Sequence, residues 1–248
     1  MSNSGDENIP NESVDVPTSG SPKPSGPPKW EEKARERVSQ AIKRFKPVVE
    51  QLRARDVVEA DTRHLVTDIL CEMLGYDKYE DLTAEYSVKG EYADYGIRLN
   101  KQIEAFVEVK RISTQLKAAH LRQVESYALK EGVEWAVLTN AQVWQVYKLE
   151  LRQGEKSDPL LVMEVDLLSE DMKSSEKVAK MFLFTKEGLS KGRLGEFMKM
   201  REALSERTLR PILVSNEVVE AVRKAVRSKT KQNVDASDVK LAISQIIG

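Results

Sequence analysis

The sequence predicts an α/β fold, a mixed β-sheet with flanking helices, followed by a C-terminal helical region. Two groups of strand-like segments between residues 86 and 168 are separated by one helical stretch, as in a sheet with a crossover helix. After about Ser169 every apolar pattern has helical spacing. The chain has 248 residues, of which 40% are hydrophobic and 32% charged, so it has room for one domain with appendages or for two small domains.

The first part of the chain predicts a tail and two helices. Residues 1–28 are rich in Ser, Pro, Asn and Gly, and they bury too little apolar surface to offset chain entropy, so we expect them to be disordered. Residues 29–55 have apolar side chains on one helical face and basic ones on the other, which predicts a basic amphipathic helix that Pro47 kinks or restarts. A second helix is expected from Thr62 to Leu74, with Gly75 at its C-cap.

The next part, residues 56–168, is predicted to form the α/β domain. Three strands are expected at 86–88, 92–99 and 103–109, with turn signals at Lys89-Gly90 and Asn100-Lys101. A helix over 114–130 then leads to strands at 134–139, 143–149 and 159–168. The order is that of an αβββαβ core. The C-terminal helical region, residues 169–248, is expected to contain helices at 174–184, 193–206, 215–229 and 236–247, with Ser215 and Asp235 as N-caps.

Charge is distributed unevenly, although the net charge is only −1. Residues 56–168 carry 13 basic and 21 acidic side chains, whereas 29–55 carry nine basic and four acidic ones, and 169–248 carry 16 basic and 11 acidic ones. An acidic middle between basic segments fits a metal-binding core with basic arms for phosphates. The alternative is that the lysine-rich helices only present solvated faces.

The candidate chemistry lies in residues 91–127. A period of two along residues 103–110 places Glu108 and Lys110 on the same face of one strand, and Asp94 lies on the strand before it, across a turn. Two carboxylates suit Mg²⁺ (or Mn²⁺), which prefers oxygen ligands and keeps several waters, and the backbone carbonyl of Val109 is a further candidate ligand. Lys110 is placed to orient or deprotonate an attacking water and to offset phosphate charge. We therefore predict a phosphodiester hydrolysis site with Asp94, Glu108 and Lys110 as its catalytic residues.

These residues resemble the PD-(D/E)XK nuclease superfamily, in particular the N-terminal nuclease domain of type I restriction enzyme R subunits. Asp94, the Glu108-Val109-Lys110 triplet and the helical pair Gln123 and Tyr127 carry the resemblance. The segments 59–63, 74–77, 135–140 and 143–147 extend it to roughly residues 56–168. It implies that Glu59 lies near the metal site, and that Gln123 and Tyr127 contact DNA or stabilise the active-site helix. For Tyr127 the alternative is a core position, and for Glu59 an ordinary acid at a helix start.

The chain departs from the family pattern at two points. Ala93 stands where the superfamily motif has proline, and no G-x-x-x-x-G-K-[ST] phosphate loop occurs, so the ATP-driven motor of R subunits is not expected here. The predicted function is a magnesium-dependent deoxyribonuclease, a hydrolase of a restriction-modification or phage-defence system, with DNA as its partner. The alternatives are a non-catalytic nucleic-acid-binding module and a docking or homo-oligomerisation role for the C-terminal helices.

The remaining residue types argue against other site classes. Cys71 is the single cysteine, and its apolar helical setting predicts a buried, inert thiol in a reducing compartment. A zinc site needs three or four ligands at suitable spacing, which one cysteine and two distant histidines, His64 and His120, do not provide. No stretch approaches the ~18 apolar residues of a membrane span, and the N-terminus lacks an apolar signal region, so a cytoplasmic protein is expected.

Overall fold

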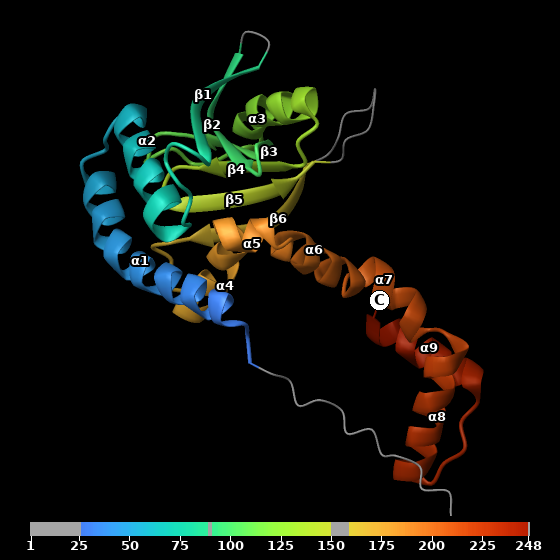
Figure 1. The fold of residues 1–248 in the computed structure, drawn as a ribbon. Helices are drawn as coiled ribbons and strands as arrows, with labels where there is room; N and C mark the ends of the chain where they lie inside the picture. The colour runs from blue at the N-terminus through green and yellow to red at the C-terminus, as the bar shows by residue number, and fades with distance from the viewer. Residues whose placement is uncertain (1–25, 89–90, 150–158, 248) are drawn as a thin grey trace, which may run out of the picture.

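The computed structural model describes residues 26–88, 91–149 and 159–247, so most of the expected tail and the Lys89-Gly90 turn lie outside the described residues. Six strands form one sheet in sequence order (Figure 1): β1 Leu82–Val88, β2 Glu91–Leu99, β3 Gln102–Val109, β4 Trp135–Thr139, β5 Val143–Lys148 and β6 Leu160–Asp166. All neighbours are antiparallel except β3 and β4, which are parallel and are joined by the crossover helix α3, Ala118–Glu131. The predicted α/β class with a mixed sheet is confirmed.

Three helical segments precede the sheet and six follow it. The first are α1 Lys29–Ala54, α2 Glu59–Asp68 and the π-helical turn η1 Ile69–Met73. The others are α4 Ser174–Leu183, α5 Lys186–Ser190, α6 Arg193–Ala203, α7 Glu206–Leu213, α8 Asn216–Thr230 and α9 Ala236–Ile247.

The first helix corrects an expectation. We expected Pro47 to kink or restart it, and the restart is wrong, because α1 runs through Pro47 as one helix of 26 residues. Proline removes one backbone donor from a helix interior. The buried side chains Phe45 and Val49 on either side of it anchor the same face of α1 in the core, and their packing offsets that loss.

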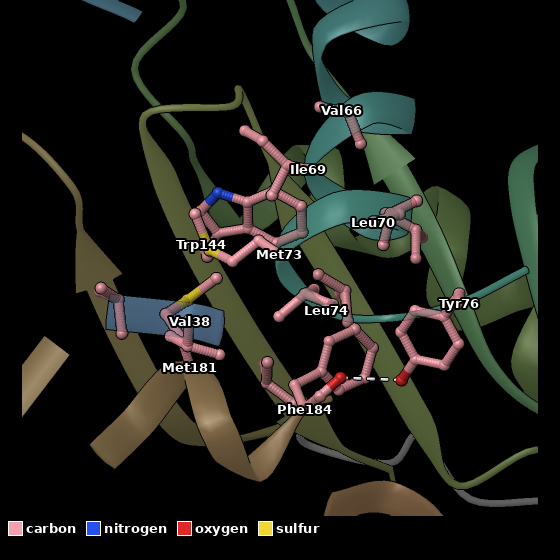
Figure 2. Close-up of a cluster of buried hydrophobic side chains, with 14 of the residues drawn as sticks. Val38, Val66, Ile69, Leu70, Met73, Leu74, Tyr76, Trp144, Met181 and Phe184 are labelled. Carbon is pink, nitrogen blue, oxygen red and sulfur yellow. Dashed lines mark hydrogen bonds between the residues drawn. The ribbon is translucent and has the colours of Figure 1, made fainter. Parts of the chain in front are cut away.

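The helices cover the two faces of the sheet unequally (Figure 1). On one face α3 packs alone, over a small cluster that includes Phe106, Val124 and Tyr127. The other face carries the larger core, built with α1, α2, η1, α4 and α6. Figure 2 shows its centre, where Trp144 of β5 lies among side chains of η1, α1 and α4, and where the Tyr76 hydroxyl donates a 2.7 Å hydrogen bond to the Phe184 carbonyl oxygen.

The larger core includes side chains from both sides of the two boundaries expected from the sequence, 55/56 and 168/169. Arg37 of α1 connects segments across both of them. Its guanidinium donates to the carbonyl oxygens of Met73 and Leu74 and pairs with Glu187 of α5 at 2.7 Å. Gly75 is the expected helix terminator, with φ +80°, and a Cβ there would lie 2.6 Å from the Arg37 guanidinium. Glycine therefore lets the η1 end and α1 meet.

The β2–β3 hairpin determines which residues of the two strands lie side by side at the candidate site. Asn100 and Lys101 have φ of 50° and 69°, the left-handed pair that a tight two-residue hairpin turn requires, as their residue types predicted. The turn pairs Leu99 with Gln102, and a register shift between Ile97 and Arg98 then sets Tyr95 opposite Val107, which brings Asp94 to the level of Glu108.

Beyond the sheet, α7–α9 extend away from the core (Figure 1). In this C-terminal arm, which we define as residues 206–247, only Val219 and Val239 are buried. The predicted N-cap Ser215 accepts a hydrogen bond from the Val218 N–H, and the Asp235 carbonyl oxygen accepts one from the Val239 N–H. Among the described helices, none combines the length and apolar composition that a membrane span requires.

Candidate active site

The candidate site begins where β2 and β3 part. Their pairing ends at Tyr95 and Val107, and the Asp94 side chain then takes the place of a ladder bond: its Oδ2 accepts a 2.8 Å hydrogen bond from the Val109 N–H. The side chain keeps only 14% of its exposure. Asp94 of β2 is thereby fixed beside the last residues of β3, which is the juxtaposition that the sequence predicted.

Glu108 and Lys110 form a buried ion pair at the end of β3. Because Phe106 faces α3, the period of two places Glu108 on that same face. The Lys110 Nζ donates to Glu108 Oε1 at 2.5 Å, and the two side chains are 17% and 3% exposed. The second carboxylate oxygen, Oε2, is buried and has no hydrogen-bond partner among the described residues. A buried oxygen with free lone pairs costs free energy unless a ligand supplies the missing interaction.

Burial and mutual repulsion raise the pKa of both carboxyl groups. For Glu108, burial raises the pKa to about 7, against the hydrogen bond from Lys110, and the charges of Asp94 and Glu59 raise it further. Burial likewise raises the pKa of Asp94, although the Val109 N–H and Arg63 oppose this. Burial alone would lower the pKa of Lys110, but Glu108, Glu59 and Asp94 together raise it. The site therefore concentrates negative charge that a cation would relieve.

Helix α2 supplies two further charged groups. Glu59 begins the helix, and its charge acts on the pKa values of Asp94, Glu108 and Lys110. Arg63, one turn later, approaches Asp94 with its Nη1 3.3 Å from Oδ1. The buried Thr62 fastens this helix to the chain after Lys110, since its Oγ1 accepts from the Ile112 N–H at 3.1 Å.

Arg63 is the functional candidate that sequence reasoning missed. It was part of the recognised segment 59–63 but was given no role. The available signal was its spacing from Glu59, because residues at i and i+4 share one helical face.

The pair on α3 is connected internally. Gln123 Nε2 donates to the Tyr127 hydroxyl at 2.8 Å, and Tyr127 is 2% exposed in the cluster under α3. In the described part of the chain, neither forms a hydrogen bond or ion pair with Asp94, Glu108 or Lys110. This arrangement supports the helix-stabilising role among those that the resemblance implied. His120, at the start of α3, lies closer to the site, since burial and then Lys110 lower its pKa.

The comparison with known families agrees with this geometry. Residues 58–160 match the type I restriction enzyme R protein N terminus. The match supports a restriction-enzyme-like nuclease domain over this segment, and the resemblance read from the sequence is confirmed. No curated protein and no solved structure matches the chain. The match covers less than half of the chain and leaves α1 and α4–α9 outside it, although α1 and α4 share the core of the R-protein N-terminal domain.

The donor set of this domain fits a hard divalent cation. Within residues 26–88, 91–149 and 159–247, Glu108 Oε2 has no hydrogen-bond partner and Asp94 Oδ1 faces the Arg63 guanidinium, and both are carboxylate oxygens. Within the described residues no group of three His, Cys, Asp or Glu side chains is arranged to hold a metal ion. Mg²⁺ needs no such group, because one or two carboxylates with backbone and water oxygens complete its shell.

A hollow of about 470 Å³ opens beside Asp94, between α2 and the edge strand β1. Its polar lining includes Arg63, His64, Lys78 and Glu85. Cys71 lies elsewhere, half-buried against the larger core rather than fully buried as expected, and burial raises the pKa of its thiol, which keeps it unreactive.

Proposed function

We propose that the R-protein N-terminal domain of this chain hydrolyses DNA phosphodiester bonds with Mg²⁺ or Mn²⁺. The observation that carries the proposal is the buried, unpartnered Oε2 of Glu108, beside Asp94 and Lys110. Asp94 and Glu108 would hold the cation together with the Val109 carbonyl oxygen. When bound, the cation would polarise the phosphate and make a coordinated water acidic.

The protein groups have separable roles in this proposal. The Val109 N–H holds one oxygen of Asp94, so the other is turned to the ligand without loss of side-chain entropy on binding. Lys110, as the ammonium partner of Glu108, donates a hydrogen bond to the attacking water and offsets the charge that builds up on the phosphate. Glu59 adds negative charge at the cation position.

The proposal is tested by incubating the purified chain with supercoiled, linear and single-stranded DNA in Mg²⁺ or Mn²⁺. We expect cleavage that Asp94→Asn and Glu108→Gln reduce at least about 100-fold, the scale of losing one preorganised electrostatic group. Asp61→Asn, an exposed acid on the same helix as Glu59, is the matched control and should cleave normally. Cleavage that survives Asp94→Asn, or no cleavage of any DNA form by the wild type, would reject the proposal.

The second candidate is a domain that binds nucleic acid without cutting it. It would be favoured if DNA binding needs no metal, survives Lys110→Ala, and is accompanied by no cleavage. In that case the basic side chains of the C-terminal arm are the candidate binding surface.

A further inference from the structure

The second half of α8 presents a row of basic side chains. Residues 223–231 contain five cations, Arg223, Lys224, Arg227, Lys229 and Lys231, and no acid. Arg223 and Arg227 are spaced i and i+4, with Lys224 adjacent, so these three share one helical face, and Lys231, the C-cap of α8, lines a hollow with Lys224 and Arg227. We call Arg223, Lys224, Arg227 and Lys231 the basic face of α8.

This face is hollowed rather than flat. Arg223, Lys224 and Arg227 line one hollow with Asn233, Val234 and Asp235 of the segment leading to α9. Lys224 and Arg227 also line a second hollow with Ser228 and Lys231. Because the two hollows share Lys224 and Arg227, they form one continuous basic surface at the free end of the arm.

The charge on this face is little compensated. In the described part of the chain Arg223 is the one member with an ion pair, to Glu220 at 3.0 Å, and Asp235 is the single acid that lines the hollows. Lys224, Arg227 and Lys231 are exposed. An ordinary solvated helix intersperses charges of both signs, whereas this segment keeps its cations together and leaves all but Arg223 without an ion pair in the described residues, as expected for a polyanion site.

The residue composition of the arm favours one class of polyanion over anionic membranes and single-stranded nucleic acid. A helix that inserts into an anionic membrane carries large apolar side chains beside its cations, but residues 223–231 contain only Ala225 and Val226 as apolar residues. Single-stranded nucleic acid is held by stacking on aromatic rings, and residues 206–247 contain no Phe, Trp, Tyr or His. A duplex, recognised through its phosphates alone, remains.

We propose that the basic face of α8 binds the phosphate backbone of double-stranded DNA, without sequence preference. The steps of four residues place cations about 6 Å apart along the helix, comparable to consecutive phosphates of one strand. The inference rests on the proposed function only in that DNA is the substrate. Because this surface lies on the arm and the carboxylates lie at the end of β3, it raises affinity without taking part in the reaction (Figure 1).

The experiment compares two double charge reversals in the full chain, with EDTA present so that cleavage plays no part. Lys224→Glu with Arg227→Glu alters the basic face. Lys33→Glu with Lys43→Glu, two exposed cations of α1, makes the same change in net charge elsewhere. Binding of a fluorescent duplex of about 40 base pairs is measured by anisotropy at several salt concentrations. Circular dichroism checks the helix content, and the milder pair Lys224→Gln with Arg227→Gln repeats the test without added repulsion.

We expect the α8 reversal to weaken duplex binding at least about tenfold near 100 mM salt and to reduce the slope of log affinity against log salt by about 2. The α1 control should stay within about twofold. Equal loss in the control, an unchanged affinity in both α8 variants, no duplex binding by the wild type, or preferred binding of poly-dT or anionic vesicles through these residues would overturn the proposal. DNA binding that depends on α8 in a chain that never cleaves would overturn the nuclease proposal and leave this one standing.

Discussion

Charged side chains at the end of β3 are buried and paired, whereas those on the second half of α8 are exposed and, in the described residues, mostly unpaired. The first arrangement desolvates two carboxylates and fixes them with a backbone N–H and a lysine, which suits a small cation that must be held in one geometry. The second leaves cations hydrated and movable, which suits a long polyanion that contacts many of them weakly. The difference predicts that substitutions at the end of β3 change stability and cation binding, whereas substitutions on α8 change DNA affinity.

The largest effect on stability is expected from Lys110→Ala. The substitution leaves the Glu108 carboxylate, 3% exposed, without its cation, so at pH 8 and in EDTA the free energy of unfolding should fall by about 3 kcal/mol. The loss should shrink at pH 5, where Glu108 takes up a proton. Urea unfolding measures both values, and Lys43→Ala, an exposed lysine of α1, is the control. A loss equal at the two pH values would show that Glu108 is not the group left uncompensated.

The pH dependence of the metal-free protein gives the next largest effect. The pKa of Glu108 is about 7 in the folded state and near 4.5 when unfolded, so the folded protein binds this proton more tightly. Its contribution to stability is therefore lost as pH rises from about 4.5 to about 7, by about 3 kcal/mol at most. Glu108→Gln removes the titration, so the variant should gain on the wild type between pH 5 and pH 8. Parallel unfolding curves at both pH values would contradict this assignment.

A smaller effect, of the opposite sign, is expected at Arg63. Its guanidinium lies 3.3 Å from Asp94 Oδ1 and competes with a cation for that oxygen. Arg63→Gln should therefore tighten binding of Ca²⁺, measured by calorimetry, by about fivefold, or roughly 1 kcal/mol for a partly exposed pair. The same variant should bind DNA more weakly, because the arginine also lines the hollow beside Asp94. Weaker Ca²⁺ binding would mean that Arg63 positions Asp94 instead of competing for it.

The smallest effect on stability is expected on α8. Lys224→Ala and Arg227→Ala remove exposed side chains that have no ion pair in the described residues. The free energy of unfolding, measured by thermal melting, should therefore change by no more than about 0.5 kcal/mol. A large loss would show that these cations support the arm itself, and the contrast with the end of β3 would disappear.

The sequence predicted those features that depend on local chemistry. The period of two along β3 and the Asn100-Lys101 turn located Glu108, Lys110 and Asp94, because both signals act within a few residues. The strand predicted at 86–88 was too short, because β1 extends from Leu82 to Val88. Glu85, in its middle, has φ of 50°, and the strand has no regular alternation of apolar and polar residues that would reveal it. The short helices α5 and α7, of five and eight residues, span too few turns for a periodic signal, and Pro211 inside α7 argued against a helix there.

Other features depend on contacts between distant segments, which no local pattern encodes. The approach of Arg63 to Asp94 follows from the way Thr62 ties α2 to the chain beyond β3. The passage of α1 through Pro47 follows from burial on the larger core. The burial of Tyr127 was one of two alternatives at the sequence level, and only the packing of α3 on the sheet decides between them.

The pairing of Arg37 with Glu187 has a consequence for how the chain is made. The two residues are 150 positions apart, so α1 meets η1 early in synthesis but meets α4 and α5 only after the whole sheet has been synthesised. The part of the apolar face of α1 that packs on α4 and α5 stays exposed during that interval, which favours aggregation or chaperone binding. A gene fragment cut at the family boundaries, 58–160, would omit α1, α4 and α5, leave the remaining apolar side chains of the larger core uncovered, and should yield insoluble protein.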